Sequence, residues 1–76
     1  MVIKVLGSGC KNCKVLEANT IEAVKQMGIV ATVEKVEKIE EIMSYGVMST
    51  PALVVDEIVK SMGRVLSPED IKKFLV

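Results

Sequence analysis

The chain alternates between short β-branched runs and segments with helical periodicity, and this order restricts its fold more than any other feature. The run 2–6 is rich in β-branched residues and ends at a glycine, which predicts a buried strand. In 13–27 apolar residues recur at helical spacing, and a glycine follows. A second strand is predicted within 29–36, and a shorter helix within 39–45. The first half of the chain is therefore strand, helix, strand, helix.

The second half of the chain predicts a hairpin followed by one helix. The stretch 49–62 holds two β-rich runs separated only by Asp56 and Glu57, a gap that only a hairpin can span. Ser67 and Pro68, with acids directly after them, form a strong helix start. A strand-helix-strand unit needs a parallel pair and a hairpin needs an antiparallel one. We therefore predict an α/β fold of order βαβαββα, with a mixed four-stranded sheet and three helices in one domain, 1–76.

The apolar residues available for the core are almost all aliphatic. Half of the 76 residues are apolar but only 3% are aromatic, so Val, Ile, Leu, Ala and Met must fill the space between the layers. Met27, Met43, Met48 and Met62 are interpreted as core filler, because methionine suits irregular gaps. Met48 has a second interpretation, since it precedes Pro51 and could border the active site or meet a protein partner.

Charge and hydropathy exclude several classes of function. Ten basic residues balance ten acidic ones without a basic stripe, which argues against nucleic acid as a partner. The opening apolar run is too short for a signal peptide, and no later run approaches a membrane span. We therefore expect a cytoplasmic protein with no membrane partner. In that reducing compartment, two closely spaced cysteines are more often catalytic or metal-binding than a permanent staple.

Cys10 and Cys13, the only cysteines in the chain, leave three interpretations open. A structural disulfide would close a four-residue loop, which the chain-entropy model values at roughly 2 kcal/mol. A metal site would have two thiolates but no histidine and no third cysteine, which suits copper(I) or a zinc ion shared between two chains. Thiol-disulfide exchange needs one exposed attacking thiol and one nearby resolving thiol, and the pair offers both.

The helix that follows the pair predicts different roles for its two thiols. Cys10 falls at or just before the helix start, where free N–H groups and the positive end of the helix dipole favour a thiolate. Cys13 continues the apolar face through Leu16, so we expect it to be buried and less reactive. Cys10 is therefore the candidate nucleophile and Cys13 the candidate resolving thiol.

Three stretches, "GSGCKNCKVLE", "STPALVVD" and "MGRVLSPEDIKKFL", resemble the small archaeal and bacterial thioredoxin-like proteins, also called redox-active disulfide proteins. The resemblance implies a thioredoxin-like fold of glutaredoxin size and a thiol-disulfide oxidoreductase without a cofactor. It also implies a cis Pro51 that faces the disulfide, with Thr50 offering its backbone to an incoming peptide or thiol. The implied partners are protein or small-molecule disulfides and an electron-donating reductase, and we expect a monomer. The alternative function is a soft-metal module that binds copper or a shared zinc ion through the same thiolates.

The sequence departs from the common thioredoxin pattern at three places. Gly9 precedes the first cysteine where thioredoxins typically have tryptophan, and Lys11-Asn12 stands between the cysteines in place of Gly-Pro. Lys4 is the only ionisable residue of the first strand, where many thioredoxins carry a buried acid. Met62-Gly63-Arg64 replaces the double-glycine motif of glutaredoxins. The reduction potential and the use of glutathione do not follow from the resemblance.

Overall fold

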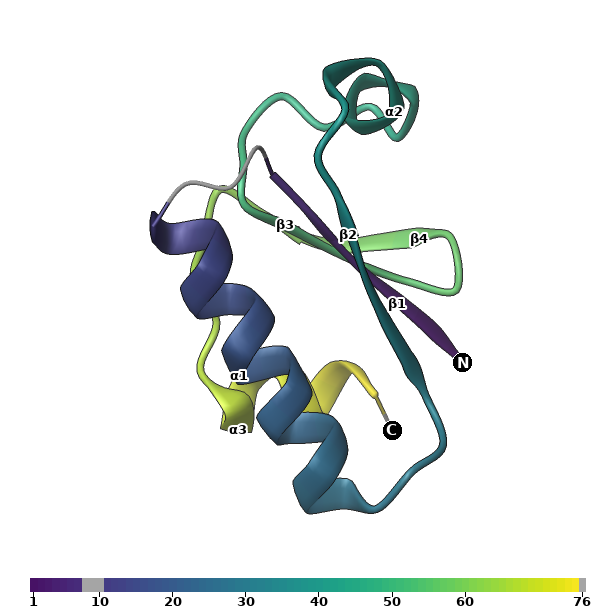
Figure 1. Ribbon diagram of the computed structural model, residues 1–76, viewed down its shortest axis with the longest axis vertical. Coiled ribbons are helices and arrows are strands. Elements are labelled where there is room, and N and C mark those ends of the chain that lie inside the picture. The colour runs from purple at the N-terminus through teal and green to yellow at the C-terminus, as the bar shows by residue number, and fades with distance from the viewer. Residues whose placement is uncertain (8–10, 76) are drawn as a thin grey trace.

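A computed structural model of the chain describes residues 1–7 and 11–75 and contains a four-stranded mixed sheet (Figure 1). The strands lie in the order β2-β1-β3-β4, with β1 parallel to β2 and antiparallel to β3, and with β3 antiparallel to β4. The predicted order βαβαββα is confirmed. The elements are β1 (Val2–Leu6), α1 (Lys11–Met27), β2 (Thr32–Val36), α2 (Ile39–Ser44), β3 (Ala52–Val55), β4 (Ile58–Met62) and α3 (Pro68–Phe74).

The sheet separates two apolar cores of unequal size. Helices α1 and α3 lie side by side on one face, and α2 lies near one end of the sheet, away from them (Figure 1). Alternation along β1 supplies both cores, because Ile3 and Val5 point to one face while Leu6 points to the other. The core beneath α1 and α3 consists of Ile3, Val5, Leu16, Ala23, Leu53, Val55, Leu66, Ile71 and Leu75. The core beneath α2 consists of Leu6, Val36, Ile42, Val47, Ala52 and Val54.

Strand β2 is shorter than the predicted run 29–36. It begins at Thr32 because Thr32 is in register with Val2, where β1 itself begins. Residues before Thr32 therefore have no neighbouring strand, although Ile29 and Ala31 still pack against the larger core.

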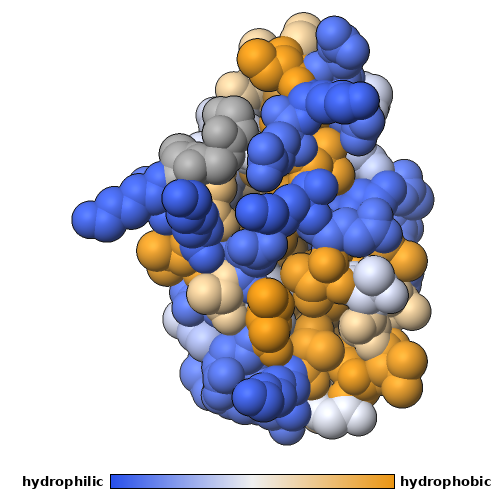
Figure 2. Space-filling model, in the orientation of Figure 1, coloured by the Kyte–Doolittle hydropathy of each residue, from blue (hydrophilic) through white to orange (hydrophobic). Residues whose placement is uncertain are grey.

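Apolar side chains gather on the lower part of the face shown in Figure 2, while hydrophilic ones cover most of its upper part.

The turn between β3 and β4 is a two-residue hairpin without glycine. Asp56 and Glu57 both have positive φ, 49° and 69°, as the tight turns that match strand twist require. Asp56 compensates for part of the steric cost by joining the start of β1: its Oδ1 accepts from the Val2 N–H at 2.9 Å, and its own N–H donates to the Val2 carbonyl at 2.8 Å. The predicted hairpin is confirmed, and its weak turn chemistry is offset by these two hydrogen bonds.

Helix ends follow the sequence signals. Gly28 has φ 65° and ends α1, and its N–H donates to the Val24 carbonyl at 3.1 Å. Ser67 caps α3, where its side chain accepts from the Asp70 N–H at 3.3 Å and Pro68 takes the first helical position. None of the helices in the described ranges is both long and apolar enough to cross a membrane.

The interpretation of the methionines as core filler is mostly wrong. Met27 is half-buried and packs against the larger core, but Met43, Met48 and Met62 are exposed by 65%, 91% and 50%. Aliphatic side chains from strands, helices and loops already fill both cores, so these three methionines are left at the surface. Met48 and Met62 thus become candidates for contact with other molecules.

Candidate active site

Cys13 lies in the first turn of α1 and is buried, with 5% of its surface exposed. It begins the buried stripe of the helix, which continues through Leu16, Thr20 and Ala23 at spacings of three and four residues. The predicted burial of Cys13 is therefore confirmed. Cys10 lies outside the described residues, so its predicted exposure and role stay predictions.

Gly7 provides the surface on which Cys13 rests. It follows the last residue of β1 and is buried, and its N–H donates to the Val36 carbonyl at 2.9 Å, which continues the pairing with β2. A Cβ at Gly7 would stand 3.0 Å from the Cys13 Cβ and would overlap the Cys13 Sγ. Only a glycine therefore lets the Cys13 side chain sit against the end of β1. Sequence reasoning treated Gly7 only as the end of a strand.

The Thr50-Pro51 bond is cis, which confirms that expectation. Pro51 is buried and Thr50 is exposed. The Thr50 Cβ lies 3.9 Å from the position that a Cβ would take at Gly7, so Cys13 and Thr50 both lie near this glycine. The structure thus brings together Cys13, Thr50 and Pro51, three of the four predicted site residues, at the end of β1. In Figure 1 the start of α1 and the chain that leads from α2 to β3 meet at this end of the sheet.

Gly63 joins the segment after β4 to the cis-proline loop. Its N–H donates to the Pro51 carbonyl at 2.9 Å, and it has φ 71°, a conformation in which glycine carries no steric penalty. Its Cβ position lies 3.1 Å from the Ser49 Cβ, so the two segments are in close contact. Arg64, the next residue, is exposed beside this contact. Sequence analysis noted Met62-Gly63-Arg64 only as a departure from a motif and missed its place beside the site.

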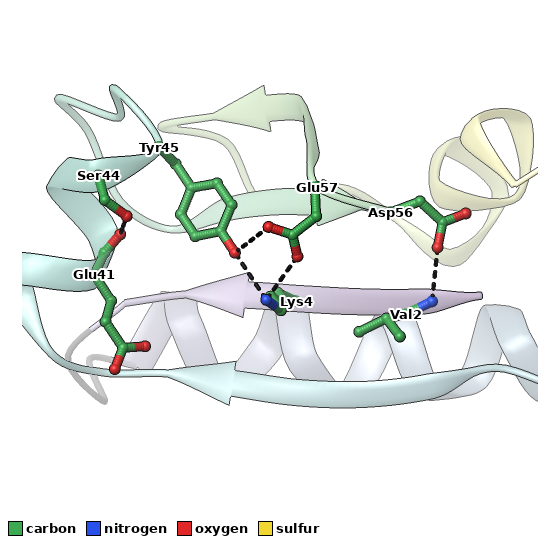
Figure 3. Close-up of polar contacts among 7 residues, drawn as sticks. All are labelled: Val2, Lys4, Glu41, Ser44, Tyr45, Asp56 and Glu57. Carbon is green, nitrogen blue, oxygen red and sulfur yellow. Dashed lines mark hydrogen bonds and ion pairs between the residues drawn. The ribbon is translucent and has the colours of Figure 1, made fainter.

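Lys4, Tyr45 and Glu57 form a charged cluster on the α2 side of the sheet (Figure 3). Lys4 is the only ionisable residue of β1. The Lys4 Nζ donates to the Glu57 Oε1 at 2.7 Å and to the Tyr45 hydroxyl at 2.8 Å, and that hydroxyl donates to the Glu57 Oε2 at 3.0 Å. The Lys4 Nζ also lies 5.5 Å from the centre of the Tyr45 ring. The hydrogen bonds that Lys4 donates to Glu57 and, second, to Tyr45 raise the pKa of Lys4, and those that Glu57 accepts from Lys4 and, second, from Tyr45 lower the pKa of Glu57.

The cluster gives both Lys4 and Tyr45 hydrogen-bond partners that are distant in sequence. Tyr45 directly follows α2 and is half-buried, and its hydroxyl is hydrogen-bonded to the side chains of Lys4 and Glu57. Lys4 forms its ion pair with the hairpin turn, so its charge is balanced by a carboxylate from a distant part of the chain. Within residues 1–7 and 11–75, no three Cys, Asp or Glu side chains cluster closely enough to hold a metal ion.

Comparison with known proteins gives a consistent family. The family model described as "Thioredoxin domain" matches residues 1–76. A protein named "Thioredoxin" from Methanothermobacter thermautotrophicus is 48% identical over 75 residues, which cover 99% of this chain and 97% of that protein. A second "Thioredoxin", from Methanocaldococcus jannaschii, is 35% identical over 75 residues, which cover 99% of this chain and 86% of that protein.

Proposed function

Because the chain belongs to the thioredoxin domain family and is a thiol-disulfide oxidoreductase, we propose that Cys10 and Cys13 form its redox-active pair and reduce disulfides of proteins or small molecules. Cys10 is the attacking thiol and Cys13 the resolving thiol. Thr50 and Pro51 receive the substrate beside them. An electron-donating reductase returns the pair to the dithiol form.

The observation that carries this proposal is that Cys13 and Thr50 both lie next to Gly7, around the position that a Cβ would take there. Cys13 is buried against the end of β1, and the Cβ of the exposed Thr50 lies 3.9 Å from that same position. A substrate chain that docks along Thr50 therefore comes close to the helix start that carries the cysteines. This supports a division between a buried resolving thiol and a substrate-facing loop.

The exchange proceeds in two balanced steps. The Cys10 thiolate attacks one sulfur of the target disulfide, forms a mixed disulfide, and expels the other target sulfur as a thiolate that takes a proton from solvent. The Cys13 thiolate then attacks the Cys10 sulfur and expels the second target thiolate, which is also protonated. The target gains two electrons and two protons, and the protein ends with a Cys10–Cys13 disulfide. The reductase supplies two electrons to restore both thiols.

The helix start alone contributes modestly to the rate of attack. Lowering a thiol pKa from about 8.5 to about 7 raises the thiolate fraction at neutral pH about sixteen-fold. The less basic thiolate is a weaker nucleophile, and a Brønsted slope near 0.45 reduces the gain to about three-fold. Orientation of the two sulfurs and of the substrate must therefore contribute most of the advantage over a free thiol.

Capture of mixed disulfides tests these roles. The Cys13→Ser variant should accumulate covalent adducts with targets from a cytosolic extract, because the first step proceeds and the second cannot. The Cys10→Ser variant should accumulate few, because the remaining thiol is buried. The measurement is nonreducing electrophoresis of captured material, released by reductant. Equal capture by both variants would refute the assigned roles.

The soft-metal alternative is tested in parallel with the same protein. Reduced wild-type protein is titrated with copper(I) and with zinc, and is assayed for reduction of a small disulfide. Turnover with weak metal binding supports exchange. Tight stoichiometric metal binding together with no turnover would overturn the proposal in favour of a metal-binding module.

A further inference from the structure

A groove beside the cis-proline loop has no role in the exchange chemistry described above. It has a volume of about 310 Å³ and runs between β4, the segment after it, and α3. This volume is at the lower end of the range of small-molecule pockets, about 300–1,000 Å³, so it suits one or two side chains of a peptide better than a whole cofactor. The lining residues are Val59, Lys60, Ser61, Met62, Arg64, Leu66 and Phe74.

The groove lies next to the candidate active site. Gly63 stands between two lining residues, Met62 and Arg64, and its N–H donates to the Pro51 carbonyl. The Cβ position of Gly63 lies 3.1 Å from the Ser49 Cβ, so the segment after β4 lies against the residues that precede Pro51. An extended peptide advances about 3.3 Å per residue, so a substrate seated at Thr50 reaches the groove within a few residues of its cysteine.

The charged side chains among the described residues that line the groove are both positive. They are Lys60 and Arg64, and no carboxylate from residues 1–7 or 11–75 lines it. Neither forms an ion pair with any residue in 1–7 or 11–75, whereas four other lysines do. Those paired lysines are Lys4, Lys35, Lys72 and Lys73. The groove therefore offers two cations to an anionic group from another molecule.

The groove wall also contains an unused hydrogen-bonding group and apolar surface. The Ser61 Oγ is buried and has no hydrogen-bond partner among the residues that the structure describes, which leaves a polar atom that a bound backbone or side-chain group could satisfy. Leu66 is buried in the wall, and Met62 and Phe74 expose 50% and 36% of their surfaces. An occupant with a carboxylate beside an apolar side chain matches these features.

We propose that the groove binds the extended segment next to the cysteine of a substrate protein and selects substrates that carry Glu or Asp in that segment. The inference rests on the proposed function, because it names the substrate class of the same site. Arg64 and Lys60 attract the carboxylate, and Met62, Leu66 and Phe74 contact the apolar side chain beside it. Arg64, which adjoins the Gly63 contact with the loop, is the main determinant of specificity.

The test compares reduction of peptide disulfides that differ in one residue. Glu, Gln or Lys is placed in turn at each of the four positions on either side of the cysteine, and kcat/KM is measured at low and high salt. At one or two positions the Glu peptide should be reduced about three- to tenfold faster than the Lys peptide, and salt should weaken this preference. Equal values for the three peptides at every position would overturn the proposal.

Matched variants assign the preference to the groove. Arg64→Gln should lower the ratio of kcat/KM for the Glu peptide to that for the Lys peptide, and Lys60→Gln should lower this ratio less. Arg64→Glu should reverse the preference in favour of the Lys peptide. Lys25→Gln is the control, because Lys25 is an exposed lysine on α1 that does not line the groove. A preference that survives Arg64→Glu unchanged would refute the assignment.

A neutral small disulfide separates this inference from the proposed function. Wild type and Lys25→Gln should reduce it at the same rate, because it does not reach the groove. If the small disulfide is reduced but the peptides show no charge preference, the groove proposal fails and the proposed function stands. If no disulfide of either kind is reduced, both fail.

Discussion

At the scale of single residues, the site depends on a glycine that carries no functional group. Burial of Cys13 followed from the helical spacing of the apolar residues, because that stripe must face the sheet. Gly7 could not be assigned in the same way, since a glycine after a strand is expected whenever the chain turns. Its contact with Cys13 depends on the distance between the end of β1 and the first turn of α1, which sequence spacing does not give.

Gly7→Ala should destabilise the reduced protein by about 1–3 kcal/mol, because the new methyl group overlaps the Cys13 side chain. A domain of this size has roughly 4–11 kcal/mol of stability in total, so the loss should be large in a urea titration. The displaced Cys13 thiol should also be alkylated faster. Gly46→Ala is the control: Gly46 has φ 74° and no neighbour within 4 Å of its Cβ position, so the substitution adds backbone strain without touching Cys13. Unchanged stability and unchanged alkylation in Gly7→Ala would contradict the packing argument.

At the scale of elements, Lys4 connects three parts of the chain that are distant in sequence. It extends from β1 to Tyr45 at the end of α2 and to Glu57 in the β3–β4 turn (Figure 3). The sequence indicated each of these elements but not the cluster, because the three residues are 12 to 53 positions apart. The end of α2 also leads into the cis-proline loop, so the cluster holds one end of the segment that leads to Thr50.

Lys4→Met should make the stability of the protein depend less on pH below pH 7. The lowered pKa of Glu57 means that its contribution is present above the unfolded value near 4.3 and is lost as pH falls through the folded value. The raised pKa of Lys4 means that its contribution is present below about 10.4 and is lost only at higher pH, so Lys4 stays charged throughout the acid range. The urea midpoint of wild type should therefore fall more between pH 7 and pH 3 than that of Lys4→Met.

Lys25→Met is the matched control for this comparison, because Lys25 is exposed and belongs to no ion pair in the described ranges. Its urea midpoint should follow that of wild type at both pH values. An equal fall in Lys4→Met and wild type would show that Glu57 gains nothing from Lys4.

At the scale of the whole molecule, the sequence predicted the order of the helices and strands well but predicted poorly which side chains are exposed. Strand alternation, the Ser67 cap and the Asp56-Glu57 gap predicted the elements, because local periodicity and turn chemistry agree with the final sheet. The exposure of Met43, Met48 and Met62 could not be predicted, since it depends on how much core volume the aliphatic residues leave. The groove was also missed, because its lining comes from β4, α3 and the segment between them.

The unequal cores predict that the domain opens first on the α2 side. Helix α2 has six residues and a single buried side chain, Ile42, whereas α1 has 17 residues and four buried side chains. Fewer buried apolar contacts mean a smaller free energy of local opening. Amide exchange of α2 should therefore be faster than that of α1, β1 and β3, and should reflect local opening and not global unfolding.

Two truncations of buried side chains test this order. Leu16→Ala removes a side chain from the larger core and should cost about 2–5 kcal/mol, which accelerates exchange of the most protected amides about 30-fold or more. Ile42→Ala should accelerate exchange in α2 and in the loop that leads to Thr50, with a much smaller effect on α1. The loop would then lose its fixed position while the helix that carries Cys13 stays folded, so substrate reduction should fall before global stability does. Equal acceleration of α1 and α2 amides in Ile42→Ala would instead mean that both faces of the sheet unfold as one unit.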